Sequence, residues 1–338
     1  MRVGFCCKWI DHEGQIQGFK PDDAAKALNT RVTTVAWLNR QPKEVAEQRL
    51  WDLMVHNLNS IRLLVERVGA LDERLRMVRL GSDILPVYTE PTWSYFWKRS
   101  DVRDYCSKHF ADVGSLARRL GVRLSFHPGQ FCVLASTDSN IVGRSLEEFE
   151  YHADMARWMG YGKTYQDFKI NVHIAGRAGP EGIKHILPRL STEARNAITI
   201  ENDETRWGLD SSLELVDHCA LVLDIHHHWI RTGEYIAARD DRVKRIIDSW
   251  RGVRPVIHYS QSPESVLTDH KNCILPNMTL LLEQGYKKGK LRAHSNFYWN
   301  EAKNLWASTF ADQFDIQCES KAKNLASFRF AKTLGIDI

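Results

Sequence analysis

The sequence lacks the features that mark secreted and membrane proteins. No apolar run reaches the roughly 18 residues that a membrane span requires, and the N-terminal apolar stretch is too short for a secretory signal. The seven cysteines are an odd number, are scattered, and never occur with C-x-x-C spacing, so they indicate reduced thiols rather than a disulfide framework. These absences predict a soluble protein of the cytoplasm without a membrane partner.

A dominant charge, a G-x-G-x-x-G motif, a short-period repeat and low-complexity sequence are also absent. The formal net charge is only +4 in 338 residues, which is compatible with nucleic acid as a partner but does not establish it. With 43% hydrophobic residues, the chain is long enough for one large barrel or two ordinary domains.

Short apolar segments alternate with helix-like patterns along the whole chain. Eight segments are predicted as strands: 2–6, 77–81, 123–126, 169–172, 197–200, 221–223, 255–257 and 314–318. Helices are predicted at 43–68, 101–120, 145–159, 211–218, 235–249 and 321–334. Loops are predicted at 7–41, at 261–313 and after residue 173, where Gly176, Gly179 and Gly182 interrupt the sequence. This alternation is typical of a parallel sheet. Eight such units favour an α/β fold, a single (β/α)8 TIM barrel forming one domain over residues 1–338, rather than a doubly wound sheet.

Ligand-type residues stand where the predicted strands end. The run LVLDIHHHWI at 221–230 shows the pattern best, because an apolar strand gives way abruptly to Asp224 and His227 in a predicted loop. In a β/α barrel all such ends open on the catalytic face. Seven of the eight strands end in a potential metal ligand: Asp83, His127, His173, Glu201, Asp224 with His227, His258 and Glu319. Any one of these alone is explained by a strand cap or a satisfied core histidine, but the whole set needs neutralising, which metal ions provide.

Such a mixed ring of His, Asp and Glu is larger than one tetrahedral zinc needs. It fits two or three clustered ions held about 3.5–4 Å apart by bridging carboxylates. Sites of this kind favour hydrolysis of phosphate esters, because one ion lowers the pKa of a bound water and another stabilises the leaving oxygen. A metal-dependent sugar isomerase on the same fold would carry similar ligands, so the ligand chemistry alone leaves both activities open.

Several strings of the sequence resemble one family of barrel enzymes, the UV damage endonucleases, which are relatives of endonuclease IV. The strings are VRLGSDILP at 78–86, SFHPGQF at 125–131, INVHIAG at 170–176, ITIENDE at 198–204, LDIHHH at 223–228, PVIHYS at 255–260 and QCESKAK at 317–323. With VGFCC at the start and NTR at 29–31, the resemblance runs from about residue 2 to residue 335. The HPGQ-aromatic, END and D-x-x-HH strings together are specific, whereas a lone D-x-x-H would not be.

The resemblance implies a DNA repair hydrolase that incises duplex DNA immediately 5′ to UV photolesions, namely cyclobutane pyrimidine dimers and 6-4 photoproducts. It implies attack by a metal-activated hydroxide, leaving 3′-hydroxyl and 5′-phosphate ends. Mn²⁺ is the implied cofactor, as two or three ions, with Zn²⁺, Mg²⁺ or Co²⁺ as alternatives. The expected partner is damaged double-stranded DNA of the nucleoid, bound by a monomer.

Matching motif positions imply roles for individual residues. The implied metal ligands are His127, Glu201, Asp224, His227, His258 and Glu319, with His173 and His270 as further candidates. Asp83 stands where endonuclease IV relatives have histidine, so its place among the ligands is open. Glu201, Glu319 and Lys321 are the expected catalytic residues, Lys321 through a phosphate near the ions. Val256 replaces a lysine that some family members carboxylate into the metal site, so this chain does without that acid or uses a nearby residue instead.

Gln130 and Phe131 directly follow a proline-glycine turn, and the resemblance implies that they form a wedge that fills the space left by flipped-out nucleotides. A damaged dinucleotide stacks poorly, so extruding it costs less than extruding normal bases, and an inserted aromatic recovers stacking. Phe5 is expected to line the pocket for the flipped bases, and Asn29 and Arg31 are expected to contact DNA. For both phenylalanines, ordinary core packing is the alternative.

Three other functions share parts of this pattern. An abasic-site endonuclease of the endonuclease IV type would have the same hydrolytic core and differ in its preferred substrate. A metal-dependent sugar isomerase would have no use for a Gln130-Phe131 wedge. A lesion-binding protein with structural metals would bind damaged DNA without nicking it.

Overall fold

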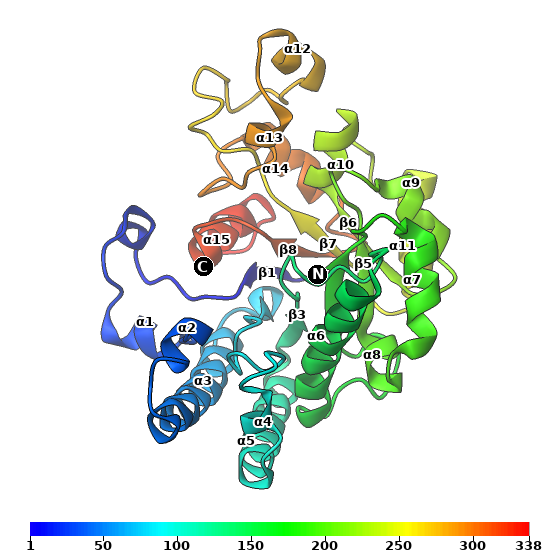
Figure 1. Ribbon diagram of the computed structural model, residues 1–338. Coiled ribbons are helices and arrows are strands. Elements are labelled where there is room, and N and C mark those ends of the chain that lie inside the picture. Colours follow the sequence, from blue (N-terminus) through cyan, green and yellow to red (C-terminus); the bar gives the residue numbers. More distant parts are fainter. Residues whose placement is uncertain (338) are drawn as a thin grey trace.

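Eight parallel strands close into a barrel, in chain order, in the computed structural model of the protein (Figure 1). The strands are β1 Val3–Cys6, β2 Met77–Arg79, β3 Arg123–Phe126, β4 Lys169–His173, β5 Ile198–Glu201, β6 Ala220–Asp224, β7 Val256–Tyr259 and β8 Asp315–Cys318. β8 pairs with β1 through Ile316 and Val3, which completes the circle. The structure describes residues 1–337. The predicted (β/α)8 barrel is confirmed.

Helices surround the barrel (Figure 1). The longest are α3 Lys43–Gly69, α5 Ser100–Leu120, α6 Ser139–Trp158 and α15 Lys323–Thr333. The shorter ones are α1 Asp23–Ala27, α2 Val35–Leu38, α4 Ser94–Trp97, α7 Gly179–Ile186, α8 Thr192–Ala197, α9 Leu209–Ser212, α10 Ile225–Thr232, α11 Asp241–Ser249, α12 Met278–Glu283, α13 Lys288–Leu291 and α14 Glu301–Ser308. Turns of 3₁₀ helix are η1 Glu13–Gln17, η2 Glu73–Leu75, η3 Leu187–Arg189 and η4 Leu213–Leu215. Within residues 1–337, no helix combines the length and the apolar character that crossing a bilayer requires.

The outer helices form because each carries one apolar face toward the barrel. On α3, Leu50, Leu58 and Leu64 are buried at helical spacing, and each fully buried leucine contributes about 1.5–3 kcal/mol. α5 packs beside α3 and ends where Gly121 takes a φ of 66°, a left-handed conformation that favours glycine. The predicted bounds of α3 and α5 agree with the structure to within one residue.

The prediction of a loop after β4 is wrong from residue 179 onward, because helix α7 begins at Gly179. Gly179 has a φ of 53°, and a Cβ at this position would lie 2.5 Å from the ring of Trp207. A Cβ on Gly182 would lie 2.9 Å from the side chain of Ala135. These glycines permit close packing around the start of α7 instead of interrupting the chain.

The expected loop after Asp224 is also a helix, α10. Asp224 is its N-cap, because its Oδ1 accepts a hydrogen bond from the backbone N–H of His227 at 2.7 Å. The other predicted helices between β5 and β7 are too long, since 211–218 corresponds only to the end of α9 and to η4, and 235–249 to α11. The predicted loops 7–41 and 261–313 contain short helices, and α12 stands away from the barrel at the top of Figure 1.

Candidate metal centre

Ligand-type side chains from several strand ends meet inside the mouth of the barrel. They form two groups that share Glu201, and within each group one ligand atom per residue lies within 4.8 Å of the others. The first group is His127, His173 and Glu201; the second is Glu201, Asp224, His258 and Glu319. They meet because the carboxyl ends of parallel strands open on one face, where alternate side chains point inward.

Glu201 lies at the centre of this arrangement and is fully buried. Its Oε2 is 3.3 Å from Nε2 of His127 and 3.1 Å from Nδ1 of His258. Its Oε1 is 3.4 Å from Nδ1 of His227, which brings His227 next to both groups. The side-chain amide of Asn171, on β4, donates a hydrogen bond to Oε2 and fixes the carboxylate.

Three buried atoms of the second group have no hydrogen-bond partner within residues 1–337: Oε1 of Glu201, Oδ2 of Asp224 and Nδ1 of His258. Leaving one such atom unpaired costs about 1–3 kcal/mol, so three in one cluster are costly unless another ligand satisfies them. A divalent cation accepts lone pairs from imidazole and carboxylate together, as Mn²⁺ and Zn²⁺ do. The donor set therefore fits a metal ion.

Burial and neighbouring charges shift the pKa values of most of these groups toward the protonation states that bind a metal. Burial lowers the pKa of His258 to about 4 and also lowers that of His127, so both imidazoles are neutral at pH 7. Burial alone would raise the pKa of Glu201, but His258, His173 and His127 outweigh it and hold it well below its usual range. Burial alone would also raise the pKa of Glu319, but the guanidinium of Arg79 outweighs this effect and holds that pKa well below its usual range. Neutral imidazoles and ionised carboxylates are the forms that bind metal.

Asp224 and His227 behave differently because they face each other. Burial raises the pKa of Asp224 to about 8. Burial would lower the pKa of His227, but the carboxylates of Asp224 and Glu201 raise it to about 9. Without a metal, this coupled pair therefore retains at least one proton at neutral pH, which a cation would have to displace.

Three predicted ligands lie outside both groups among the described residues: His227, which is next to Glu201, and Asp83 and His270, which are not. β2 ends at Arg79, and the chain then turns outward, so Asp83 is exposed and lines a separate cavity. His270 lies far along the β7–β8 excursion, with its ring 6.4 Å from that of Trp299. Lys321 is exposed and lines a cavity of about 500 Å³ together with residues of the β7–β8 excursion.

Three residues at the cluster escaped the sequence interpretation. Arg79, the last residue of β2, donates a hydrogen bond to Glu319. Lys169, the first residue of β4, is buried with Nζ 2.8 Å from Nε2 of His258, and burial lowers its pKa to about 7. His294 is half-buried close to Glu319, which opposes the lowering of its pKa by burial. A charged residue within a predicted buried strand was the available signal for Arg79 and Lys169.

The expected lesion-contacting residues divide into exposed and buried ones. Phe131 is 86% exposed and Gln130 is exposed beside it, so core packing does not explain Phe131. Phe5 is 1% exposed and packs edge-on against Trp9, so the expectation that it lines a pocket is wrong, because its strand turns the ring into the core. The side chain of Asn29 accepts a hydrogen bond from the backbone N–H of Trp9 at 2.8 Å and donates one to the Trp9 carbonyl at 2.9 Å. Both of its polar atoms are therefore already bonded within the protein.

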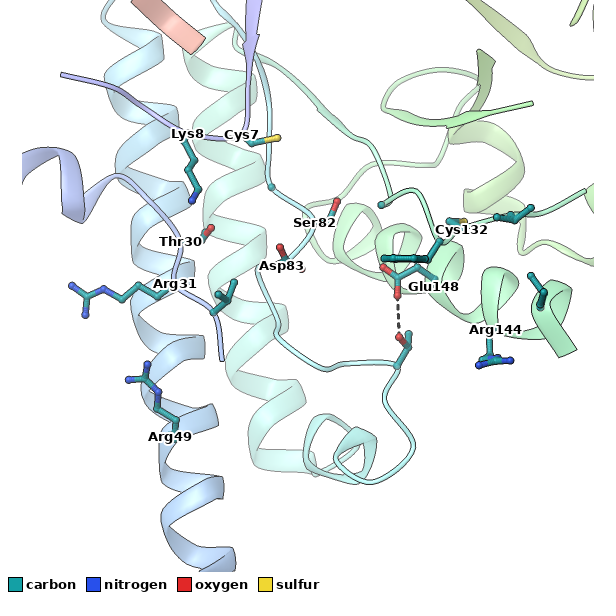
Figure 2. Close-up of a pocket in the computed structure, with 17 residues that line it drawn as sticks. Cys7, Lys8, Thr30, Arg31, Arg49, Ser82, Asp83, Cys132, Arg144 and Glu148 are labelled. Atoms are coloured by element: carbon teal, nitrogen blue, oxygen red, sulfur yellow. Dashed lines mark hydrogen bonds between the residues drawn. The ribbon is translucent and has the colours of Figure 1, made fainter. Parts of the chain in front are cut away.

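A cavity of about 1140 Å³ opens beside the cluster, and Phe131 lies on its wall. Figure 2 shows Lys8, Arg31 and Arg49 on one side of this cavity and Arg144 on the other. These four cations exceed its two carboxylates, and one of the two, Glu148, accepts a hydrogen bond from Thr89 at 2.9 Å. An excess of cations on a cavity wall attracts a polyanion.

The segment that follows β2 connects the wall of this cavity to the strand end at His127. Ser82 lines the cavity and donates a hydrogen bond to the backbone oxygen of His127 at 2.7 Å. Gly129 and Phe131, which follow His127, line the same cavity. The cavity wall therefore continues directly from the strand end that carries His127.

A family model and the curated relatives of this chain indicate the same family. The family model described as UV-endonuclease UvdE matches residues 17–337. A UV-damage endonuclease of Neurospora crassa is 27% identical over 237 residues, which are 62% of this chain and 35% of that protein, so the chain spans about a third of that relative. A UV DNA damage endonuclease of Bacillus pumilus is 29% identical over 253 residues, 71% of this chain and 74% of that protein.

Among solved structures, the crystal structure of SacUVDE has a TM-score of 0.72 at 22% identity and covers 99% of this chain and 98% of its own. At this identity the likeness concerns the fold. The family match is the broader result, because it includes all strands from β2 to β8 and every ligand of the two groups. The chain belongs to the UV-endonuclease UvdE family.

Proposed function

We propose that the protein acts as a monomer on duplex DNA and incises the phosphodiester bond immediately 5′ to UV photolesions, leaving 3′-hydroxyl and 5′-phosphate ends. Its family consists of endonucleases, which are hydrolases. The observation that carries the proposal is the pair of ligand groups sharing Glu201, beside a cationic cavity whose wall exposes Phe131. A sugar isomerase needs neither the cations nor the exposed aromatic.

Two divalent ions fit the two ligand groups, with Glu201 common to both, and Mn²⁺ is the proposed ion. When bound, such ions lower the pKa of water and stabilise charge on the phosphoryl and leaving oxygens. His127 and His173 would hold one ion, and Asp224, His258 and Glu319 the other, with His227 close to both groups. Zn²⁺, Mg²⁺ and Co²⁺ are the alternatives that metal analysis would separate.

The chain itself binds and orients the DNA. Lys8, Arg31, Arg49 and Arg144 hold the phosphates in the cavity, and Lys321 contacts a phosphate near Glu319. Gln130 and Phe131 enter the duplex and fill the space left by the everted lesion. Selectivity follows because a photodimer stacks poorly and is everted at lower cost than normal bases.

Incision of a defined photodimer tests the proposal directly. A duplex with one cyclobutane dimer should be cut in Mn²⁺ immediately 5′ of the dimer, with a polymerase-extendable 3′ end, and EDTA should stop the reaction. The undamaged duplex should stay intact. Stronger cutting of a duplex with an abasic site would favour the endonuclease IV type, and binding without cutting would favour a lesion-binding protein.

The contribution of His227 to the stability of the metal-free protein should fall as pH rises from about 6.5 to about 9, whereas Lys169 and Lys303, whose pKa values burial lowers to about 7, act in the opposite direction above pH 7. The folded pKa of His227 is raised from 6.5 to about 9, so its contribution is complete below pH 6.5 and is lost as pH rises through about 9. Asp224, raised to about 8, acts in the same direction. Melting temperatures across this range, in EDTA and in Mn²⁺, should diverge as pH rises. His227→Gln isolates this contribution: the difference in metal-free melting temperature between the unchanged protein and the variant should shrink as pH rises through about 9, and a constant difference would contradict the assignment.

A further inference from the structure

β4, predicted as a strand that ends at the potential ligand His173, carries three polar side chains at alternate positions. Lys169, Asn171 and His173 alternate along the strand and therefore share one face. His173 belongs to the first ligand group, and Asn171 fixes Glu201. Lys169 is 3% exposed, and its Nζ lies 2.8 Å from Nε2 of His258.

The two ring nitrogens of His258 have separate partners. Nδ1 lies 3.1 Å from Oε2 of Glu201 and 3.4 Å from Oε1 of Glu319, inside the second ligand group. Nε2 faces Lys169, its hydrogen-bond partner in the described part of the chain. Rotation about the terminal torsion of histidine is broad and roughly two-fold, so the strand alone does not decide which ring edge faces the carboxylates. The partner of the remote nitrogen decides it.

Within residues 1–337, Lys169 is the side chain that is hydrogen-bonded to Nε2 of His258. Below the ligands, the side chains of Ala220, Val222 and Val256 pack with Trp250 in an apolar cluster. Val256 precedes His258 by two residues on β7 and therefore faces the same side of the strand. The polar group that reaches His258 comes instead from β4, across the barrel.

We propose that Lys169 is a positioning residue of the metal centre, which holds the ring of His258 so that Nδ1 faces Glu201 and Glu319. The proposal rests on the proposed function, because it assumes that the second ligand group binds an ion. A histidine that binds a metal usually has a carboxylate, a carbonyl or a water at its remote nitrogen. In this chain a buried amine occupies that place; in its uncharged form it accepts the hydrogen bond of Nε2–H, which leaves the lone pair of Nδ1 for the ion.

Stability alone does not explain a lysine at this position. A buried amine is costly to desolvate, and an apolar side chain of similar length would fill the same volume. Lys169→Met should therefore fold with a metal-free melting temperature equal to or above that of the unchanged protein. Its defect should be confined to metal binding.

The test compares Mn²⁺ affinity, followed by electron paramagnetic resonance, in Lys169→Met and in a matched variant. Lys303→Met is the control, because Lys303 is 1% exposed and its Nζ packs over the ring of Trp229 at 3.9 Å, outside both ligand groups. Lys169→Met should weaken Mn²⁺ binding by about 10- to 100-fold, the usual effect of losing the partner of a metal-bound histidine. Lys303→Met should leave the affinity unchanged.

A double-mutant cycle shows whether Lys169 acts through His258. In a His258→Ala background, Lys169→Met should cause no further loss of Mn²⁺ affinity, because the ring that it positions is gone. Additive losses would overturn the proposal, as would normal Mn²⁺ binding by Lys169→Met or failure of its metal-free form to fold. Absence of Mn²⁺ binding by the unchanged protein is a different result, because it would refute the metal centre of the proposed function itself.

Discussion

Glu201→Gln is expected to abolish incision and to weaken binding of both ions at once. Glu201 is the residue common to the two ligand groups, and its oxygens lie 3.3 Å from His127 and 3.1 Å from His258. Glutamine keeps the shape and can still accept the hydrogen bond from Asn171, but it brings no charge to the cations. Loss of the partner of a ligand costs about 10- to 100-fold in affinity or activity, so loss of a shared ligand should exceed about 100-fold.

Metal analysis and incision of a photodimer duplex measure this effect together. Asp154→Asn is a suitable control, because Asp154 is a partly buried carboxylate on α6 that pairs with Arg157, away from the cluster. The metal-free melting temperature of Glu201→Gln should fall, because the neighbouring imidazoles favour the ionised carboxylate, so metal content is compared on protein that circular dichroism shows to be folded. Full Mn²⁺ content with normal turnover would exclude Glu201 from the centre.

Phe131→Ala is expected to reduce incision at a photodimer by about 10- to 100-fold, because stacking of a base on an aromatic side chain contributes about 1–3 kcal/mol. The ring is 86% exposed, so its removal should change neither the melting temperature nor the Mn²⁺ content. Cleavage at an abasic site should fall much less, because that site has no base to replace by stacking.

Phe19→Ala controls for loss of an exposed phenylalanine, since Phe19 is 65% exposed and is not part of the cavity wall. Rates on the photodimer and abasic duplexes, measured side by side for both variants, give the comparison. Equal losses on the two substrates in Phe131→Ala would argue against insertion of the ring into the duplex.

The barrel and the centre of the site could be predicted because they depend on strand periodicity. An apolar run that ends in Glu201, Asp224 or His258 places the last side chain at the mouth, and parallel strands bring such ends together. Asp83 and His270 were not placed correctly because beyond a strand end the direction of the backbone is set by loop packing. A residue in a ligand-like string can therefore point away from its expected partners.

The internal cations were missed for a different physical reason. Arg79 and Lys169 belong to the strands themselves, and the contacts that retain them, with Glu319 and His258, join residues far apart in sequence. The periodicity of a strand predicts which face of the sheet a side chain occupies. It does not predict which charged side chain of another strand lies opposite it inside the barrel. The start of α6 was predictable, because the side chain of Asp138 caps it, yet the predicted start at 145 ignored that signal.

The two oxygens of Asp224 have different tasks. Oδ1 anchors the first turn of α10 through the N–H of His227, whereas Oδ2 is the unpaired atom offered to a cation. α10 continues to Trp229 and Ile230, whose side chains pack against the β7–β8 excursion. An ion held by Oδ2 would therefore share one carboxylate with the N-cap of α10, so that removing the ion is expected to increase amide exchange in the first turn of α10 and in the part of the excursion packed against it.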